Sequence, residues 1–468
     1  LEPIANPDFF ESCDKPETFK KLCFGLAYVH GFVQERRSFG PIGWNIPYGF
    51  DDGDLRISVR QLHMYVNDND ETPFAALKYA TGECNYGGRV TDDKDRRLLN
   101  TLLNRVYRAE ALEPEFKLSE SGTYVIPEPG DVQTYLDAIA ALPILPRPEA
   151  FGLHDNADIT KDLNHTALLT ETLIKTGGGS GGGGGGQEQL VAKMVKECLE
   201  RLPANFDIEA VQRKFPVRYE QSMNTVLAQE MLRYNRLLSI IRGSLQQLER
   251  AIAGLTVMSA ELETVFNSFA IGQVPKMWMG KSFPSLKPLA GYVDDLLARL
   301  DLFESWYRDG QPPCFWISGF FFTPSFTTAA LQNFARINKY AIDTVGFEME
   351  MLGMNHEEYT TAPESGIYIY GLFLEGCGWD KERNVLTESR PKVLFEPAPC
   401  IWLKPQKLSD ISEYTHYSCP VYRTAERRGV LATTGHSTNF LMMMKMPTAG
   451  DEEEHWTLRG VCLLCSLS

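Results

Sequence analysis

The sequence predicts an α+β fold in which helices come first and short strands follow. Two observations support this class. Up to about residue 312, apolar residues recur with helical spacing. From Phe315 onwards, short runs of aromatic and β-branched residues alternate with Gly and Pro turns. Several short strands of this kind are typical of a sandwich or a barrel.

The composition is typical of a large folded protein. With 468 residues, of which 43% are hydrophobic and 11% aromatic, the sequence allows an extensive core, and we expect two or three domains. Its 61 acidic and 46 basic residues give a net charge of −15, which argues against nucleic acid or an anionic membrane as the main partner. No apolar run approaches the roughly 18–20 residues of a membrane span. Residues 1–14 are acidic and contain proline, unlike a signal peptide.

The ten cysteines are widely spaced, which is typical of free thiols in a reducing compartment inside the cell and not of a disulfide scaffold. Cys462 and Cys465 form a C-x-x-C pair between apolar residues. A zinc site needs a second pair of ligands with suitable spacing, and the sequence offers none. We therefore expect both cysteines to be strand residues.

The region before residue 145 is predicted to be a module of short helices. Helices are expected over residues 19–37, from Asp54 with that residue as the N-cap, over residues 74–80 with Thr72 as cap and Pro73 in the first turn, and over residues 93–107. Three prolines between Leu142 and Pro148 stop any helix and mark a boundary.

Residues 146–312 are predicted to be a second helical region. The stretch GGGSGGGGGG at residues 177–186 is either an engineered joint or a native low-complexity insertion, and both interpretations stay open. Helical periods follow over residues 187–202, over the proline-free stretch 217–274 with breaks near Gly243 and Gly254, and over residues 288–306. Within the strand-rich remainder, residues 326–336 are expected to form a helix. The runs expected as strands are 315–317, 367–370, 400–403, 417–422, 439–444 and 456–464.

Candidate catalytic motifs are weak. Gly280-Lys281-Ser282 is similar to the end of a phosphate-binding loop, but Pro275 stands where that loop needs glycine, so a loop between helices is expected. The acidic run 51–54 is better explained as a helix start than as a cation site, and the acidic run 451–454 as a solvated hairpin tip. No H-x-x-x-H pair and no poised nucleophile is evident. We expect no catalytic residue, metal ligand or cofactor-binding residue in this sequence.

One polar loop, residues 81–92, is a candidate docking surface. Its glycines permit unusual backbone angles, and Asn85, Arg89 and Asp92 offer directional contacts. Two interpretations stay open. The loop either satisfies its own hydrogen bonds, or it presents Arg89 to a carboxylate of a neighbouring module.

Several longer motifs resemble the end of the motor ring of dynein heavy chains. They follow the order of that family over nearly the whole sequence, and the last of them is similar to the terminal strand of axonemal members. The motifs are Glu35-Arg-Arg-Ser-Phe-Gly-Pro-Ile-Gly-Trp-Asn45, Asp54-Leu-Arg-Ile-Ser58, Thr81-Gly-Glu-Cys-Asn-Tyr-Gly-Gly-Arg-Val-Thr-Asp92, Phe151-Gly-Leu-His-Asp-Asn-Ala-Asp-Ile159, Glu220-Gln-Ser-Met-Asn224, Met277-Trp-Met-Gly-Lys-Ser-Phe-Pro-Ser-Leu-Lys-Pro288, Phe315-Trp-Ile-Ser-Gly-Phe320, Leu331-Gln-Asn-Phe-Ala-Arg336 and Trp456-Thr-Leu-Arg-Gly-Val-Cys-Leu-Leu464. The glycine stretch departs from the family, in which this loop is variable.

The resemblance implies three domains. Residues 1–145 would be the helical small subdomain of the sixth and last AAA+ module. Residues 146–312 would be the helical part of the C-terminal domain, and residues 313–468 its antiparallel β-barrel. The Gly280–Ser282 loop would lie where the family binds no nucleotide.

The resemblance also implies a function. The parent protein would be an ATP-driven, minus-end-directed microtubule motor of the axoneme in cilia and flagella, part of the cytoskeleton of the cytoplasm. ATP and Mg²⁺ would bind in upstream modules, and the microtubule would bind an upstream stalk. Partners would be the other AAA+ modules of the same chain and the dynein intermediate and light chains. This segment would act as a mechanical brace of the ring. The alternatives are an independent protein-binding module and a stand-alone enzyme that uses Lys281 on a nucleotide.

Overall fold

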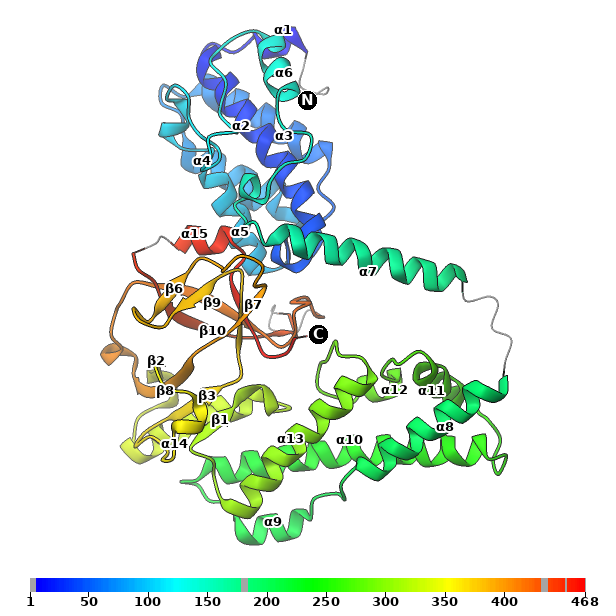
Figure 1. The fold of residues 1–468 in the computed structure, drawn as a ribbon. Helices are drawn as coiled ribbons and strands as arrows, with labels where there is room; N and C mark the ends of the chain where they lie inside the picture. The colour runs from blue at the N-terminus through cyan, green and yellow to red at the C-terminus, as the bar shows by residue number, and fades with distance from the viewer. Residues whose placement is uncertain (1–5, 178–183, 431–436, 451–452, 468) are drawn as a thin grey trace.

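The computed structural model describes residues 6–177, 184–430, 437–450 and 453–467. Figure 1 shows a helical module at one end of the molecule, β-sheets in the middle and a bundle of longer helices at the other end. The chain runs from the helical module into the bundle and only then forms the sheets. The last elements of the chain therefore return to lie beside the first module, where α15 packs against α5.

The helical module is built around the long helix α2. Twelve of its twenty residues are buried, because neighbouring helices cover it on several sides. Its helices are α1 (Pro7–Phe10), α2 (Pro16–Glu35), α3 (Asp52–Asp68), α4 (Phe74–Tyr79), α5 (Asp93–Asn104) and α6 (Val132–Ala140), with short 3₁₀ or π turns η1 (Arg36–Ile42), η2 (Ala80–Asn85), η3 (Gly87–Arg89), η4 (Ala109–Leu112) and η5 (Pro148–Phe151).

The predicted helix starts in this module need small corrections. Asp51, and not Asp54, is the N-cap of α3, and Asp54 is the third helical residue, whose side chain accepts from the Asp51 N–H in a capping box. Pro73 is the cap of α4 and not its first helical residue. The proline-rich stretch 142–148 does interrupt the helices as expected, since α6 ends at Ala140.

Helix α7 (Ala157–Gly177) extends from the helical module, where it packs against η1 (Figure 1). The bundle contains helices α8 (Gly184–Arg201), α9 (Ile208–Lys214), α10 (Ser222–Ile252), α11 (Ala260–Ala270), α12 (Lys276–Met279) and α13 (Leu289–Asp309). Gly254, with φ of 72°, lies in the break between α10 and α11, as predicted. The predicted break at Gly243 is wrong, because α10 continues through it. A mid-helix glycine costs about 1 kcal/mol, which the buried apolar face of α10 outweighs. Most of the glycine stretch, residues 178–183, lies outside the described residues.

The last third of the protein forms two sheets, a small hairpin and two helices. One sheet has the order β1-β3-β8-β2, the other β10-β9-β11-β4-β7, and β5 pairs with β6. The elements are β1 (Cys314–Trp316), α14 (Thr323–Asn338), β2 (Val345–Leu352), β3 (Ile367–Tyr370), β4 (Phe373–Glu375), β5 (Gly378–Asp380), β6 (Val385–Thr387), β7 (Phe395–Pro397), β8 (Cys400–Lys407), β9 (His416–Tyr422), β10 (Phe440–Pro447), α15 (Glu453–Leu458) and β11 (Cys462–Leu464), besides 3₁₀ turns at Ile317–Gly319, Ile342–Thr344, His356–Glu358 and Leu408–Asp410.

The expected antiparallel β-barrel is wrong. A barrel requires every strand to pair on both sides. Among the strands that the structure describes, β1 and β2 remain edges of one sheet, and β10 and β7 remain edges of the other. Strands β4 to β7 contain three residues each, too few to extend a closed hydrogen-bonded ladder. Both sheets are also mixed, since β1 runs parallel to β3 and β11 parallel to β9.

The predicted terminal strand over residues 456–464 is wrong in its first half. That half belongs to α15, and Gly460, with φ of 69°, turns the backbone into β11. The predicted hairpin tip at 451–454 is corrected in the same way, because Glu453 and Glu454 begin α15; residues 451–452 lie outside the described part. Cys462 is a strand residue as expected, whereas Cys465 follows the end of β11.

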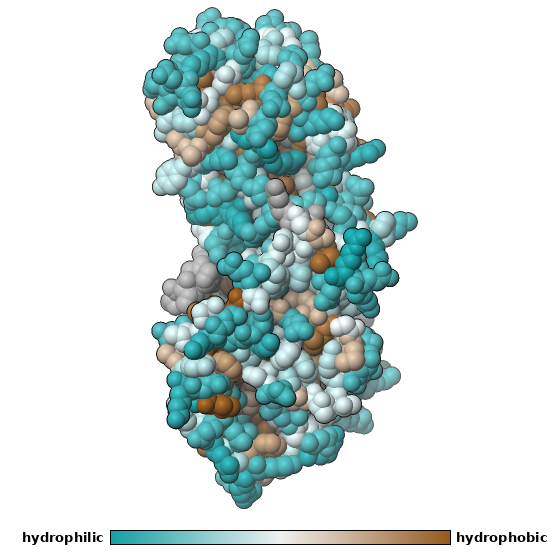
Figure 2. Space-filling model, turned by 90° about the vertical axis from the view of Figure 1, so that its left-hand side faces the viewer, coloured by the Kyte–Doolittle hydropathy of each residue, from teal (hydrophilic) through white to brown (hydrophobic). Residues whose placement is uncertain are grey.

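Two main cores divide the molecule. One is formed by buried residues between Phe10 and Ala157, and the other by buried residues between Val191 and Cys465. Leu458 at the end of α15 packs against the first core although it follows the sheets in sequence. The face in Figure 2 is mostly hydrophilic, with scattered hydrophobic patches. No helix among the described residues has the length and apolarity to cross a membrane.

Candidate functional site: the junction of the helical module and the terminal segment

The contact between the helical module and the terminal segment, here called the junction, contains a dense set of polar contacts. It joins η1, α5 and the stretch before α7 to β9, α15, Gly460 and β11. Its partners are distant in the sequence: Arg97 and Ser418 are 321 positions apart, and Arg36 and Leu458 are 422 positions apart. The fold alone brings them together. The junction is therefore the candidate functional site.

Arg36 lies at the centre of the junction and is completely buried, with 0% exposure. Its Nη1 and Nη2 atoms each donate to the carbonyl oxygen of Leu458 at 3.3 Å, and Nη1 also donates to that of Phe151. Its Nε donates to the carbonyl of Gly43 at 3.1 Å. One guanidinium thus satisfies carbonyl groups of both halves of the molecule, which matters because buried carbonyls without a donor are costly.

Helix α5 contributes a second set of contacts. The Nη1 atom of Arg97 donates to the Ser418 carbonyl at 2.9 Å and to Glu453 at 3.1 Å, and its Nη2 donates to the Tyr417 hydroxyl at 2.9 Å. Further along the helix, Asn104 donates to Glu454 at 2.6 Å. The first two residues of α15 thus hold the same face of α5.

A buried polar group lies beside these contacts. Asn45 donates to the Tyr422 hydroxyl at 2.8 Å and to Asp92 at 3.3 Å. Asp95 accepts from the backbone N–H groups of Asn45 and Ile46 at 3.0 and 3.1 Å. Burial and the nearby charge of Asp92 raise the pKa of Asp95 to about 7, although these N–H groups oppose the rise.

Two glycines allow the backbones to approach. A Cβ atom on Gly460 would lie 2.4 Å from the carbonyl oxygen of Ile42, and one on Gly152 would lie 2.9 Å from the Leu458 Cβ. Both glycines also have positive φ angles, 69° and 76°. No other residue fits at Gly460 unless the two halves move apart.

Arg459 and Glu388 extend the junction to the β5–β6 hairpin. Arg459 donates to the Gly152 carbonyl at 3.2 Å and pairs with Glu388 at 3.2 Å. His455 contacts the same carboxylate at 2.6 Å. Burial tends to raise the pKa of Glu388, but the His455 contact and the charge of Arg459 lower it to about 2.

A buried ion pair next to β11 also contacts the turn at Gly460. Arg427 donates to Glu375 at 2.6 Å and to the Gly460 carbonyl at 2.9 Å, and both charged side chains are buried. Removing one partner of such a pair leaves the other charge buried and unpaired, which is costly. Because Arg427 is held in this way, its bond to the Gly460 carbonyl fixes the geometry of the turn.

The space left in the junction is a cavity of about 30 Å³, about the volume of one water molecule. The junction is a packed contact and not a ligand pocket.

The structure places the predicted loop residues in contacts within the helical module. Asn85 donates to Ser58 at 2.9 Å and to Gln61 at 2.7 Å. Arg89 donates to Asp54 at 3.0 Å and to Asp51 at 2.6 Å, so its fork binds the start of α3. Hydrogen bonding to Asp54 raises the pKa of Arg89.

Asp92 has a different position from the other two loop residues. It caps α5 by accepting from the N–H groups of Lys94 and Asp95, and it also contacts Asn45 of the junction. The structure therefore brings Asn85 and Arg89 together on α3 and places Asp92 at the junction. Docking of the loop to another module stays a prediction.

Gly280, Lys281 and Ser282 lie between α12 and α13, which confirms the expectation of a loop between helices. Ser282 contacts the Tyr292 hydroxyl at 2.7 Å. Among the described residues, no group of three His, Cys, Asp or Glu side chains is arranged to hold a metal ion.

Sequence reasoning missed the junction residues Arg36, Asn45 and Arg97 as a set. Arg36 and Asn45 belong to the family motif 35–45, which the sequence shows. The sequence does not show that this motif contacts the terminal segment. The only local signal was the odd position of a charged residue, Arg36, within an apolar helical stripe. Its partner Leu458 is 422 positions away, and no spacing rule links the two.

Known proteins of one family match this sequence from end to end. A family model described as the C-terminal domain of the dynein heavy chain matches residues 161–465, and a second, described as the dynein heavy chain AAA lid domain, matches residues 19–157. Human "Dynein axonemal heavy chain 12" is 49% identical over 470 aligned residues, which cover 100% of this chain and 15% of the relative.

Two further relatives agree. Mouse "Dynein axonemal heavy chain 3" is 50% identical and covers 100% of this chain, and human "Dynein axonemal heavy chain 1" is 46% identical and covers 98%. The aligned part is 11% of each of these relatives. The chain thus spans about 11–15% of the length of the proteins that it resembles.

Proposed function

This chain belongs to the dynein heavy-chain family, and from that premise we propose that it is the C-terminal part of an axonemal heavy chain. The family resemblance noted in the sequence is confirmed by the matches to both family models. The parent protein would be an ATP-driven, minus-end-directed microtubule motor of cilia and flagella. The proposal rests on relatives that are 46–51% identical over 98–100% of this chain and whose names describe axonemal heavy chains.

Within that motor, the segment acts as a brace. The observation that supports this role is the junction, in which Arg36, Arg97 and Asn104 of the helical module bind the terminal segment. A contact that closes the last elements onto an early module makes the two parts move together. It can then transmit a change in one part to the other, provided that the two parts have two arrangements.

The domain assignment follows the same proposal. Residues 1–145 form the helical small subdomain of the last AAA+ module, residues 146–312 the helical part of the C-terminal domain, and residues 313–468 its sheet part. ATP and Mg²⁺ bind in upstream modules, and the microtubule binds the upstream stalk. The other AAA+ modules and the intermediate and light chains are the partners, and the axoneme is the location.

The brace is tested with neighbouring arginines in the full-length heavy chain. Arg97→Ala removes a contact across the junction. Arg96→Ala removes bonds to Glu83 and Val90, which both lie within the helical module. We expect Arg97→Ala to slow microtubule sliding while nucleotide binding is retained, and Arg96→Ala to slow it less. Equal sliding velocities in the two variants would overturn the mechanical role.

The loop prediction is examined in the same assay. If Arg89 docks to another module, Arg89→Ala alters sliding velocity or ATPase activity in the full-length motor. If the loop serves only α3, Arg89→Ala lowers the stability of the helical module and leaves both activities unchanged. The two outcomes separate the interpretations left open by the sequence.

A further inference from the structure

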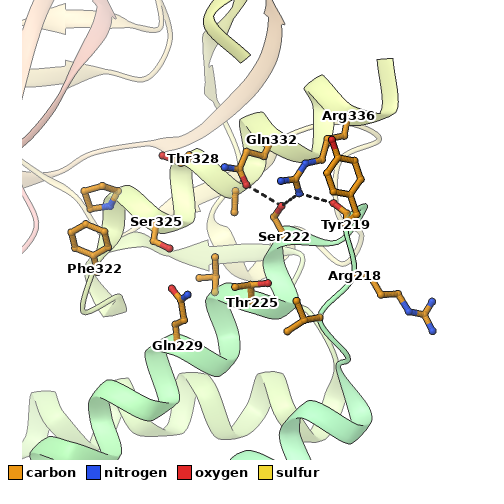
Figure 3. A pocket seen from close by; sticks show the side chains of 14 residues that line it. Arg218, Tyr219, Ser222, Thr225, Gln229, Phe322, Ser325, Thr328, Gln332 and Arg336 are labelled. Atoms are coloured by element: carbon orange, nitrogen blue, oxygen red, sulfur yellow. Dashed lines mark hydrogen bonds between the residues drawn. The ribbon is translucent and has the colours of Figure 1, made fainter. Parts of the chain in front are cut away.

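A groove lies between the N-terminal half of α10 and the whole of α14, on the side of the molecule away from the helical module. We call it the α10–α14 groove. Its volume is about 800 Å³. Figure 3 shows Ser222, Thr225 and Gln229 of α10 facing Ser325, Thr328 and Gln332 of α14 across it. The Ser222 hydroxyl donates to the Gln332 side chain at 3.2 Å at one end of the groove. The hydroxyl and amide groups of the lining can both donate and accept hydrogen bonds.

Cations gather at one end of the groove. Arg336 donates to the Tyr219 carbonyl at 2.5 Å and to the Ser222 hydroxyl at 2.7 Å, and its guanidinium lies 4.2 Å from the Tyr219 ring centroid. Arg218 lines both this groove and an adjoining hollow of about 400 Å³, which Lys214 also lines. Lys214 donates to the carbonyls of Tyr307 and Arg308.

None of these three cations forms an ion pair among the described residues, although the Arg308 hydrogen bond and, to a lesser extent, the charge of Lys214 lower the pKa of the nearby Asp309. The bonds of Arg336 and Lys214 go to neutral oxygen atoms, and within the part of the sequence that the structure describes none of the three has a carboxylate at ion-pair distance. The molecule as a whole carries a net charge of −15. Over residues 211–242 the sequence has six basic and two acidic residues, a local charge of 6 − 2 = +4.

The acids of that stretch do not neutralise the groove. Glu230 is buried and accepts from the N–H groups of Phe321 and Phe322 and from Arg233. It thereby fixes the entry into α14 and the far end of the groove. Glu220 is exposed beside Tyr219 and has no cation at ion-pair distance among the described residues. The basic end therefore attracts anions from outside.

The far end of the groove is apolar. The ring of Phe322 is 42% exposed and lines the groove beside Pro324. The guanidinium of Arg233 lies 5.0 Å from the centroid of that ring and holds it in place. At the basic end the Tyr219 ring is 69% exposed. An exposed aromatic ring at each end offers contact area for apolar side chains.

The length of the groove indicates the shape of its occupant. Phe322 and Arg336 are 336 − 322 = 14 residues apart along α14, which corresponds to about 21 Å at 1.5 Å per residue. A peptide in extended conformation covers that distance with about six residues. A lining that can bond peptide N–H and C=O groups along its length suits such a segment better than a compact ligand.

We propose that the α10–α14 groove binds an acidic linear segment of a partner protein in extended conformation. Its carboxylates lie at Arg218 and Arg336, its backbone bonds the hydroxyl and amide groups of the lining, and an apolar side chain packs on Phe322. The occupant is a separate protein and not the acidic start of α15, because Glu453 and Glu454 already bind Arg97 and Asn104 at the junction.

The test measures binding of fluorescein-labelled octapeptides to the 468-residue protein by anisotropy. The probe alternates glutamate and threonine and ends in phenylalanine, and the control probe has lysine in place of glutamate. We expect the acidic probe to bind, with an affinity that falls as salt rises, and the basic probe to bind at least about tenfold more weakly.

Three single substitutions test whether the peptide binds in the α10–α14 groove. Arg218→Glu reverses the charge at the groove and is expected to weaken binding about tenfold. Arg250→Glu makes the same charge change near the other end of α10, on an exposed residue that does not line the groove, and is expected to change binding less than about twofold. Thr328→Trp fills the groove without changing charge and should also prevent binding, with folding verified by circular dichroism and thermal unfolding.

Three results would overturn the proposal. They are the absence of binding to the unsubstituted protein, equal binding of acidic and basic probes, and equal weakening by Arg218→Glu and Arg250→Glu, which would mean general charge attraction. Self-association that Arg218→Glu abolishes, with no peptide binding, would assign the groove to a second copy and would also overturn it.

Discussion

The junction and the α10–α14 groove both contain arginines, but the arginines are used differently. At the junction, Arg36 and Arg97 bond groups on the opposite half of the molecule, and the remaining cavity is about 30 Å³. In the groove, Arg218 and Arg336 stand at the end of a hollow of about 800 Å³ without a carboxylate partner among the described residues. The difference teaches that the junction is a closed contact, in which the arginines have their partners and little space remains. The groove, in contrast, retains charge and space for another molecule.

This contrast has consequences for stability. A buried arginine that serves several carbonyl groups is costly to remove, because the carbonyls then lose their donors. An exposed arginine at a groove contributes little to folding, and its removal affects mainly what binds there. Substitutions at the two places should therefore separate stability from binding.

The largest effect is expected for Arg36→Met. The methionine keeps part of the packing but leaves the carbonyls of Leu458, Phe151 and Gly43 without their donor, so the free energy of unfolding should fall by about 3–5 kcal/mol. Urea unfolding followed by circular dichroism measures the change. The control Arg37→Met alters an exposed neighbour and should cost less than about 1 kcal/mol. Similar losses in both variants would contradict the importance of the junction.

Gly460→Ala tests the close approach of the two backbones. The new Cβ would meet the Ile42 carbonyl at 2.4 Å in a residue with positive φ, and we expect a loss of about 2–4 kcal/mol. Gly254→Ala is the matched control, since Gly254 has φ of 72° and no atom within 4 Å of the added Cβ. Gly254→Ala should lower the free energy of unfolding only by the cost of placing alanine at a positive φ, about 1 kcal/mol. If thermal unfolding gives equal losses, the backbones at the junction are not closely packed.

Glu388 gives the junction a dependence on acid pH. Its pKa is lowered from 4.5 to about 2 in the folded protein, so its stabilisation is complete above pH 4.5 and is lost as pH falls from 4.5 towards 2. The side chain is 43% exposed, and after solvent screening we expect a contribution of about 1 kcal/mol. In urea unfolding at pH 6 and pH 3, Glu388→Gln should lose less stability between the two values than the unsubstituted protein. An unchanged pH dependence would show that His455 and Arg459 do not hold this carboxylate.

The smallest effect on folding is expected at the groove. Arg218→Glu should change the free energy of unfolding by less than about 0.5 kcal/mol, because the side chain is exposed and has no hydrogen-bond partner among the described residues. Urea unfolding in parallel with Arg36→Met provides the comparison. A loss above about 1.5 kcal/mol, well beyond the range of ordinary surface substitutions, would mean that Arg218 belongs to the folded framework.

The helices were largely predictable from the sequence, and the joining of distant parts was not. Helical periods located α2, α10 and α13 because each packs its apolar residues against elements of its own region. The barrel was wrong because strand composition does not say which strands are neighbours, and Trp456 lies in a helix although its surroundings have strand composition. Arg36 depends on a contact with Leu458 across 422 positions of the sequence. No local rule reveals such a contact.

The most direct test of the brace is hydrogen exchange in the Arg97→Ala and Arg96→Ala variants. Only Arg97 reaches β9 and α15, whereas Arg96 serves residues 83–90 of its own module. The account predicts that Arg97→Ala raises amide exchange in Glu453–Leu458 and in the first residues of His416–Tyr422 about tenfold, as expected for a loss of about 1.4 kcal/mol, while Arg96→Ala leaves those segments unchanged. Equal exchange of α15 and β9 in the two variants would contradict the claim that the junction ties the terminal segment to the helical module.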